Sequence, residues 1–197
     1  MSILSEWLDQ TQAEEVECLV PDMSGIARGK IVPANKFLKG VEDRSLRLPE
    51  VVFSMAVTGD FVDESEIVSE VNTDILMVPD ENSIRVVPWY DYSSAQVICD
   101  AVYTNGELVD LAPRSVLKRI LKMYEENGWK PVVAPELEFY FVKKNLDPDN
   151  PLEAPIGLSG RKESGRQAYG IDAANEFDHV VEDIYDFCEK AHIDIDT

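Results

Sequence analysis

The sequence has few of the residues that build disulfide frameworks, zinc sites and histidine-based catalytic centres. Three cysteines and two histidines occur among 197 residues. Cys18, Cys99 and Cys188 are far apart, so no pair has the spacing of a zinc or redox motif. The first two stand in apolar runs, which favours buried, reduced thiols in a cytoplasmic protein. His179 and His192 lack a Cys, Ser or second His in a useful pattern, so a surface or capping role is expected for both.

Basic residues are also scarce, since 18 Lys and Arg stand against 38 Asp and Glu and the net charge is −20. This charge argues against nucleic acid, which requires a basic surface, and against anionic membranes. No apolar run is long enough to cross a bilayer, and the N-terminus has no signal-peptide pattern. Hydrophobic residues make up 45 % of the chain, enough for a packed core. The dispersed acids indicate a solvated acidic surface, with a field that attracts cationic ligands as the alternative.

The first half of the chain is predicted to be rich in strands. Turn signals separate short runs of alternating or β-branched residues. The expected elements are a helix over residues 2–9, a β-hairpin over 16–33, a helical turn over 34–39 closed by Gly40, and strands over 74–78, 83–89 and 95–103. Residues 44–70 combine an apolar patch with a run of acids, and we expect a long loop there.

The pattern changes near Pro113, after which apolar residues recur at helical spacing as far as Asn127-Gly128. The elements expected next are a strand over residues 132–142, a loop over 145–166, a helix over about 173–191 with Asp172 as N-cap, and a strand over 192–197. The change of character predicts two domains, 1–108 and 109–197. The second has too few elements for a closed α+β domain, so we expect the chain to be a fragment.

The run Pro135-Glu136-Leu137-Glu138-Phe139 is the most informative segment. Its valine and aromatic flanks are typical of a strand, on which Glu136 and Glu138 share one face about 7 Å apart. Carboxylates this close repel each other unless a cation lies beside them. Mg²⁺ or Mn²⁺ is the natural candidate because hard divalent ions take oxygen ligands. An edge strand whose polar face meets water is the alternative.

The loop Gly160–Gly165 has the glycine spacing of a P-loop. Arg166 and Gln167 follow it where Lys and Ser or Thr are required, so it is not a Walker motif. Arg161, Lys162 and Arg166 nevertheless form the densest basic cluster of an acidic chain. The segment is either a mobile surface loop or a basic loop that folds over an anionic substrate.

Five segments, in the correct order, resemble the glutamine synthetase family, and most closely its γ-glutamylpolyamine (γ-glutamylputrescine) synthetase branch. They are Val16–Pro33 with its Asp22, Gly25, Arg28, Gly29 and Lys30 core, Leu76–Asp80, Ala112–Leu117, Ala134–Tyr140 and Arg166–Asp172. The resemblance implies an α+β fold, with an N-terminal β-grasp domain over 1–108 and the truncated start of the catalytic domain over 109–197.

The resemblance also implies an ATP-dependent ligase. In the family, glutamate is phosphorylated on its γ-carboxylate and an amine then displaces phosphate. Divalent metals, Mg²⁺ or Mn²⁺, neutralise the phosphates. By position, Glu138 would hold the metal on the glutamate side and Glu136 the one that bridges the ATP phosphates. Tyr169 falls where the family has an aromatic residue beside the substrate pocket.

Two departures from the family pattern bear on function. Ammonia-using members carry Phe-Asp-Gly-Ser-Ser, whose aspartate helps to form the ammonium site, and Ser54 stands at that position here. This favours a polyamine or another alkylamine as nucleophile. Family members are also much longer, so the chain alone is expected to be inactive. In the family the β-grasp domain completes the active site of the neighbouring subunit in ring-shaped oligomers, so the resemblance also implies a homo-oligomer. An ammonia-using glutamine synthetase and a non-catalytic assembly or metal-binding module are the alternatives.

Overall fold

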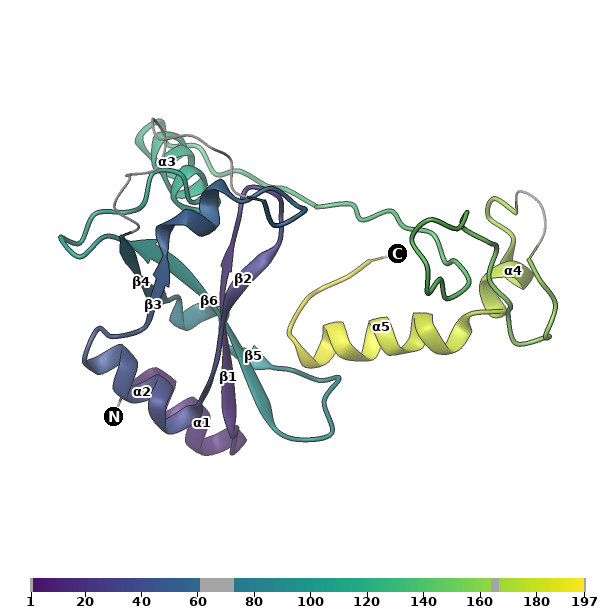
Figure 1. The fold of residues 1–197 in the computed structure, drawn as a ribbon, viewed down its shortest axis with the longest axis horizontal. Helices are drawn as coiled ribbons and strands as arrows, with labels where there is room; N and C mark the ends of the chain where they lie inside the picture. The colour runs from purple at the N-terminus through teal and green to yellow at the C-terminus, as the bar shows by residue number, and fades with distance from the viewer. Residues whose placement is uncertain (1, 61–72, 164–166, 197) are drawn as a thin grey trace. The chain divides into compact units, whose positions relative to one another are not determined.

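The computed structural model describes residues 2–60, 73–163 and 167–196 (Figure 1). The chain divides into two compact units, 1–131 and 132–197, and each is described by itself. Both helices and strands are present, as expected for an α+β protein. Within the described ranges, no helix combines the length and the apolar character needed to cross a membrane.

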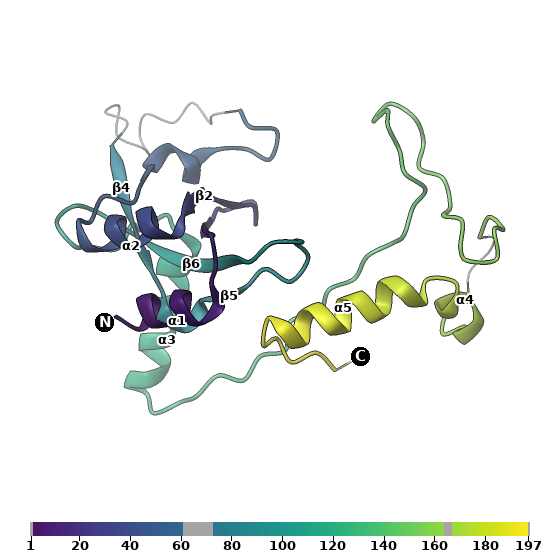
Figure 2. The same cartoon turned by 90° about the horizontal axis from the view of Figure 1, so that it is seen from below.

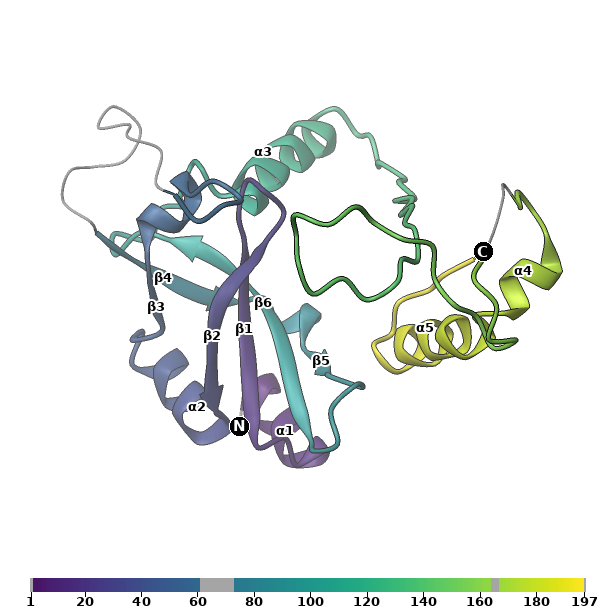
Figure 3. The ribbon, with the colours of Figure 1, turned by 45° about the vertical axis from the view of Figure 1, so that its right-hand side comes forward.

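The first unit is built on one mixed sheet. Its strands are β1 (Glu15–Pro21), β2 (Ala27–Pro33), β3 (Arg47–Pro49), β4 (Asp74–Pro79), β5 (Arg85–Val86) and β6 (Ser94–Val102). The order is β2-β1-β6-β4-β3, with β5 paired to β6. β1 and β6 are parallel and the other pairs are antiparallel, so the two strands at the centre are joined by a long crossover (Figure 3).

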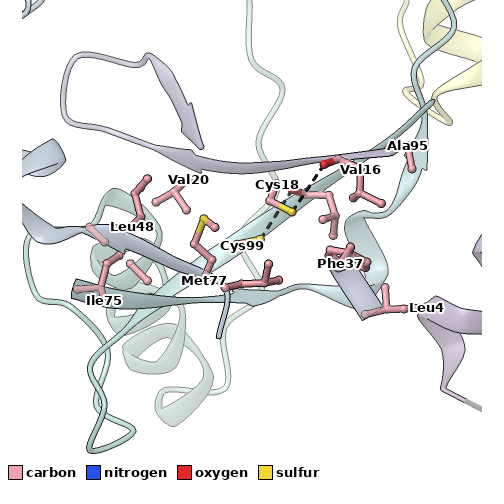
Figure 4. Packing of buried hydrophobic residues seen from close by; sticks show 14 of the residues in the cluster. Leu4, Val16, Cys18, Val20, Phe37, Leu48, Ile75, Met77, Ala95 and Cys99 are labelled. Atoms are coloured by element: carbon pink, nitrogen blue, oxygen red, sulfur yellow. Dashed lines mark hydrogen bonds between the residues drawn. The ribbon is translucent and has the colours of Figure 1, made fainter. Parts of the chain in front are cut away.

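Alternation along the two central strands builds the core. Val16, Cys18 and Val20 of β1 are almost fully buried, and so are the corresponding residues of β6. Helices α1 (Ile3–Thr11) and α2 (Ala34–Glu42) contribute Leu4 and Phe37 to the same cluster (Figure 4). The predicted buried, free state of Cys18 is confirmed, as is that of Cys99, whereas Cys188 is only half-buried.

Asp22 organises the turn between β1 and β2. Its carboxylate is buried and accepts the backbone N–H groups of Ser24 and Ile26, each at 2.9 Å. Arg28 Nε donates to the second oxygen at 2.8 Å. Burial raises the pKa of Asp22, but the bonds from Arg28 and the two amides outweigh it and hold the pKa below its usual range. The charged form of Asp22 therefore stabilises the predicted hairpin, which is confirmed.

Helix α3 (Pro113–Glu126) begins with Pro113 and is attached to the sheet by its first turn. Arg114 donates from Nε to Asp100 at 2.9 Å and from Nη2 to Asp80 at 2.7 Å. Lys118 also pairs with Asp100. Both arginine bonds are largely shielded from solvent, so they fix the start of α3 on the first unit more firmly than exposed pairs would.

The second unit contains little buried surface. Its helices are α4 (Ile171–Asn175) and α5 (Asp178–Lys190), with α4 lying beyond the N-terminal end of α5 (Figure 2). Phe177, between them, stacks on Phe141 with ring centroids 5.0 Å apart. Ala191 is the one residue of this unit that is classed as buried among its described residues.

Several predicted elements are wrong. The helix expected over 173–191 is interrupted at Glu176-Phe177, because Glu176 accepts N–H groups from Leu158 and Ser159 and Phe177 stacks on Phe141. The N-cap positions belong to Gly170 and Phe177, not Asp172. The strand expected over 83–89 is shortened to β5. The strand expected over 192–197 is absent from the described residues of that range.

The sequence indicated that Gly40 would end its helix, but the helix continues past it. It lies inside α2, where a Cβ atom would come within 2.7 Å of the Leu46 side chain. The glycine therefore permits a close packing contact. The left-handed position after the helix belongs to Arg44, with φ +52°. Of the loop expected over 44–70, residues 47–54 form β3 and a 3₁₀ helix, and 61–72 lie outside the described residues.

We predict that Asp22→Asn destabilises the first unit by about 1–3 kcal/mol at neutral pH, because the charge-assisted bond from Arg28 is lost. The folded-state pKa of Asp22 is lowered, so its contribution is present above the unfolded-state pKa and disappears as the pH falls through the folded value. Urea unfolding at neutral and strongly acidic pH measures both effects. Asp9→Asn, on an exposed helical position, is the control. Equal stability of Asp22→Asn and wild type would contradict this role.

Candidate metal and substrate residues

Glu136 and Glu138 lie on an extended segment that forms no ladder with any described part of the chain, so the strand predicted over 132–142 is wrong. A strand requires a partner for its backbone N–H and C=O groups, and none is supplied here. The segment exposes its apolar side chains, with Leu137 at 88 % and Tyr140 at 93 % of full exposure. Its residues consequently have the composition of a buried strand without the sheet that would bury it.

The two glutamates are exposed and take part in no hydrogen bond or ion pair within the described residues. Their oxygens are the ligand type that Mg²⁺ and Mn²⁺ prefer, so the donor set fits such an ion. These ions take about six ligands. No group of three His, Cys, Asp or Glu side chains suited to a metal occurs in the part of the chain that the structure describes. Glu136 and Glu138 would therefore be two ligands of an incomplete site.

Tyr169 lies in a turn just before α4 and is fully exposed. Its φ is +57°, a left-handed conformation that non-glycine residues adopt infrequently. The turn is held by a bond from Gly170 N–H to the Gln167 carbonyl at 3.1 Å. No hydrogen bond or ring contact joins Tyr169 to Glu136 or Glu138 among the described residues.

Ser54 belongs to the first unit and ends the 3₁₀ helix Glu50–Ser54. Its hydroxyl donates to the Val51 carbonyl at 2.9 Å. The hydroxyl hydrogen is thus used within the helix, while the oxygen retains the capacity to accept a hydrogen bond. Ser54 provides a polar but uncharged group at this position.

Glu50, at the start of the same 3₁₀ helix, is a buried carboxyl that sequence reasoning missed. It is 6 % exposed and accepts a 2.5 Å hydrogen bond from the Tyr103 hydroxyl. Burial, followed by the bond to Glu50, raises the pKa of Tyr103 to about 12. The available signal was a lone acid in the apolar run Leu48–Phe53, but its partner is 53 residues away in the sequence.

The predicted basic cluster is partly neutralised. Glu153 accepts hydrogen bonds from Lys162 at 3.0 Å and from Lys143 at 3.1 Å. The bond from Lys162 and then that from Lys143 lower the pKa of Glu153. Arg161 is exposed, and Arg166 lies outside the described residues. Neither the mobile-loop interpretation nor the substrate-loop interpretation is tested by these contacts.

Three comparisons relate the chain to known proteins. Residues 110–197 match the family model "Glutamine synthetase, catalytic domain". The γ-glutamylputrescine synthetase of Escherichia coli (strain K12) is 31 % identical over 92 % of this chain and 38 % of that protein. A glutamate–isopropylamine ligase of Pseudomonas sp. is 28 % identical over 72 % of this chain and 31 % of that protein.

The similarity extends to a solved structure. The crystal structure of a "novel glutamine synthase homolog" superposes with a TM-score of 0.52 at 19 % identity, over 58 % of this chain and 27 % of that one. This comparison supports the fold alone. The chain spans 38 % and 31 % of the lengths of the two curated relatives.

We predict that Tyr103→Phe costs about 1–3 kcal/mol at neutral pH, because it leaves the buried Glu50 carboxylate without its donor. In wild type, the raised folded-state pKa of Tyr103 contributes stability that is complete below the ordinary value of 10.0 and is lost as the pH rises to about 12. Chemical unfolding across this pH range should show a steeper decline for wild type than for Tyr103→Phe.

Tyr185→Phe is the matched control, since Tyr185 is 45 % exposed on α5. This variant should retain the wild-type dependence on alkaline pH. Parallel pH profiles of wild type and Tyr103→Phe would show that the bond between Tyr103 and Glu50 does not stabilise the fold.

Proposed function

Because the chain belongs to the glutamine synthetase family, we propose that it is the N-terminal part of an ATP-dependent glutamate–amine ligase. The observation that carries the proposal is the similarity to a γ-glutamylputrescine synthetase along 92 % of this chain. The similarity to a glutamate–isopropylamine ligase supports the same class of reaction. Both relatives are named for joining a glutamyl group to an alkylamine.

The proposed reaction forms an amide in two steps. The γ-carboxylate of glutamate attacks the terminal phosphorus of ATP, which releases ADP and leaves a γ-glutamyl phosphate. The amine nitrogen then attacks the acyl carbon, the bond to the phosphate oxygen breaks, and the nitrogen loses a proton. Mg²⁺ or Mn²⁺, when bound, would neutralise the negative charge of the phosphates. Glu136 and Glu138 are the residues of this chain that would hold the metals, and the oxygen chemistry of both side chains supports this assignment.

The exposed segment 132–142 is consistent with a site completed by further protein. Its alternation of carboxylates and large apolar side chains suits a strand whose apolar face is covered. The chain spans 38 % of the length of its relative, so we infer that a longer protein supplies the neighbouring strands and the other metal ligands. We propose accordingly that the 197-residue chain has no ligase activity alone.

We further propose a domain boundary at residues 108 and 109, with an N-terminal β-grasp domain before it. The central parallel pair β1 and β6, with α2 packed against the core, supports the β-grasp assignment. The family match beginning at residue 110 supports the boundary. The compact units divide later, after residue 131, because Arg114 and Lys118 attach α3 to the first unit.

The proposed nucleophile is a polyamine or another alkylamine. Ser54 provides a hydroxyl where ammonia-using members of the family provide a carboxylate, so an ammonium ion lacks that counter-charge. Tyr169 is the proposed aromatic residue beside the substrate. We place this ligase in the cytoplasm as a homo-oligomer, with glutamate, ATP and the amine as its small-molecule partners.

The metal assignment predicts that Mn²⁺ added to this chain broadens the NMR signals of residues 134–140 selectively. Glu136→Gln and Glu138→Gln should each weaken that broadening severalfold, because each removes one of two anionic oxygen ligands. Glu125→Gln and Glu126→Gln, an exposed neighbouring pair on α3, are the matched controls. Broadening spread evenly over all acidic regions would instead favour a diffuse metal-binding module.

The amine assignment predicts that the longer enzyme containing this chain turns over glutamate and ATP faster with putrescine or isopropylamine than with ammonia. Ser54→Asp should shift the ratio of kcat/KM values toward ammonia by about tenfold, since it restores an anion. Coupled ADP-release assays measure the ratio, and Ser54→Asn controls for size without charge. A wild-type preference for ammonia would favour a glutamine synthetase.

A further inference from the structure

A cavity of about 490 Å³ opens on the first unit, and none of the residues that line it is assigned to the ligase reaction. It lies where the end of α2 meets β4 and the turn after β6. Val41, Leu46, Leu76, Val78 and Val102 provide an apolar lining, and Gly40 and Gly106 bring backbone close to the space. The volume is within the range of small-molecule sites.

Arg44 is the one charged residue among the described residues that line this cavity. Its side chain is exposed and makes no hydrogen bond or ion pair with the described part of the chain. A guanidinium is planar and always charged, and it presents paired donors that match a carboxylate. The lining thus combines an apolar interior with a single available cation.

The backbone at Arg44 gives a second, independent observation. The residue follows α2 in a Schellman arrangement, in which Ser45 N–H bonds to the Gly40 carbonyl at 2.8 Å and Arg44 N–H to the Val41 carbonyl at 3.3 Å. Glycine is the usual residue at this position because φ is positive, and Arg44 has φ +52°. The position therefore holds an arginine at a conformational cost that glycine would avoid.

The local charge around Arg44 favours an anionic ligand, although the chain as a whole is acidic. Residues 27–47 contain six basic and two acidic side chains, whereas the complete chain has a net charge of −20. Lys39 and Arg47 are exposed members of this basic segment, and Arg44 lies between them in sequence. No acidic side chain lines the cavity among the residues that the structure describes. Charge complementarity consequently selects a negatively charged ligand over an amine.

We propose that this cavity binds an aliphatic monocarboxylate, with the hydrocarbon chain against Val41, Leu76 and Val102 and the carboxylate paired to Arg44. One cation matches one negative charge. The backbone groups of β4 in the lining are engaged in the sheet, so a strongly polar ligand would find few further partners. None of the proposed amine and metal residues lines this cavity, so the proposal does not depend on their assignment.

The test is a titration of the ¹⁵N-labelled chain with millimolar octanoate, 1-octanol or octylammonium chloride. Octanoate should move the amide signals of Gly40 and Gly106 saturably, and octylammonium should leave them in place. Arg44→Gly should weaken octanoate binding at least about tenfold. Its melting temperature should equal or exceed that of wild type, because glycine tolerates the left-handed position. This combination separates a binding role from a structural one.

Two further variants sharpen the experiment. Arg44→Lys should retain part of the affinity because it keeps the charge, and Arg47→Gln should retain most of it because Arg47 adds to the local charge but does not line the cavity. Three results would each overturn the proposal: no saturable shift with octanoate, equal binding of octanoate by Arg44→Gly, or binding of 1-octanol or octylammonium as tight as that of octanoate.

Discussion

The parallel pairing of β1 and β6 is the constraint on which the first unit depends. Cys18 and Val97 lie side by side at its centre and are fully buried. Strands β2, β4 and β5 each pair with one of these two strands, and β3 joins the sheet through β4. A parallel pair needs a long crossover, and here the intervening residues contribute α2, β3 and β4 on the way. The resulting core fixes the 3₁₀ helix that carries Ser54 and the buried bond between Glu50 and Tyr103.

Charge acts differently in different parts of the molecule. Asp22 and Asp100 are shielded from solvent and paired with arginine, so they fix a turn and the start of α3. Glu136 and Glu138 are exposed, and no ion pair balances their charge within the described part of the chain. The basic segment 27–47 reverses the sign of the surface locally. The overall charge of −20 therefore does not predict the charge at any one site. The role of each carboxylate depends on whether it is buried and whether it is paired with a cation.

Differences in burial also explain the contrast between the two units. The first encloses a continuous core, whereas the second leaves large side chains such as Leu137 and Tyr140 in water. Apolar surface on this scale is unfavourable unless something covers it. Residues 110–197 match the catalytic domain of glutamine synthetase, and the matched relatives are longer than this chain, which gives a physical reason for the composition of residues 132–142. Arg114 lies near the start of the matched catalytic region. Its ion pairs with Asp80 and Asp100 attach this part of the chain to the preceding sheet.

Elements with local signals could be predicted from the amino-acid sequence alone. The Asp22 turn, the Pro113 start of α3 and the alternation of β1 and β6 were all predictable, since each depends on neighbouring residues. The remaining features depend on contacts between residues that are distant in the sequence. Leu46 made Gly40 a packing position instead of a helix end, and Phe141 with Glu176 broke the predicted long helix. The strand predicted over 132–142 did not form for the same reason. A ladder requires a partner strand and burial requires a neighbouring element, and a local sequence pattern encodes neither.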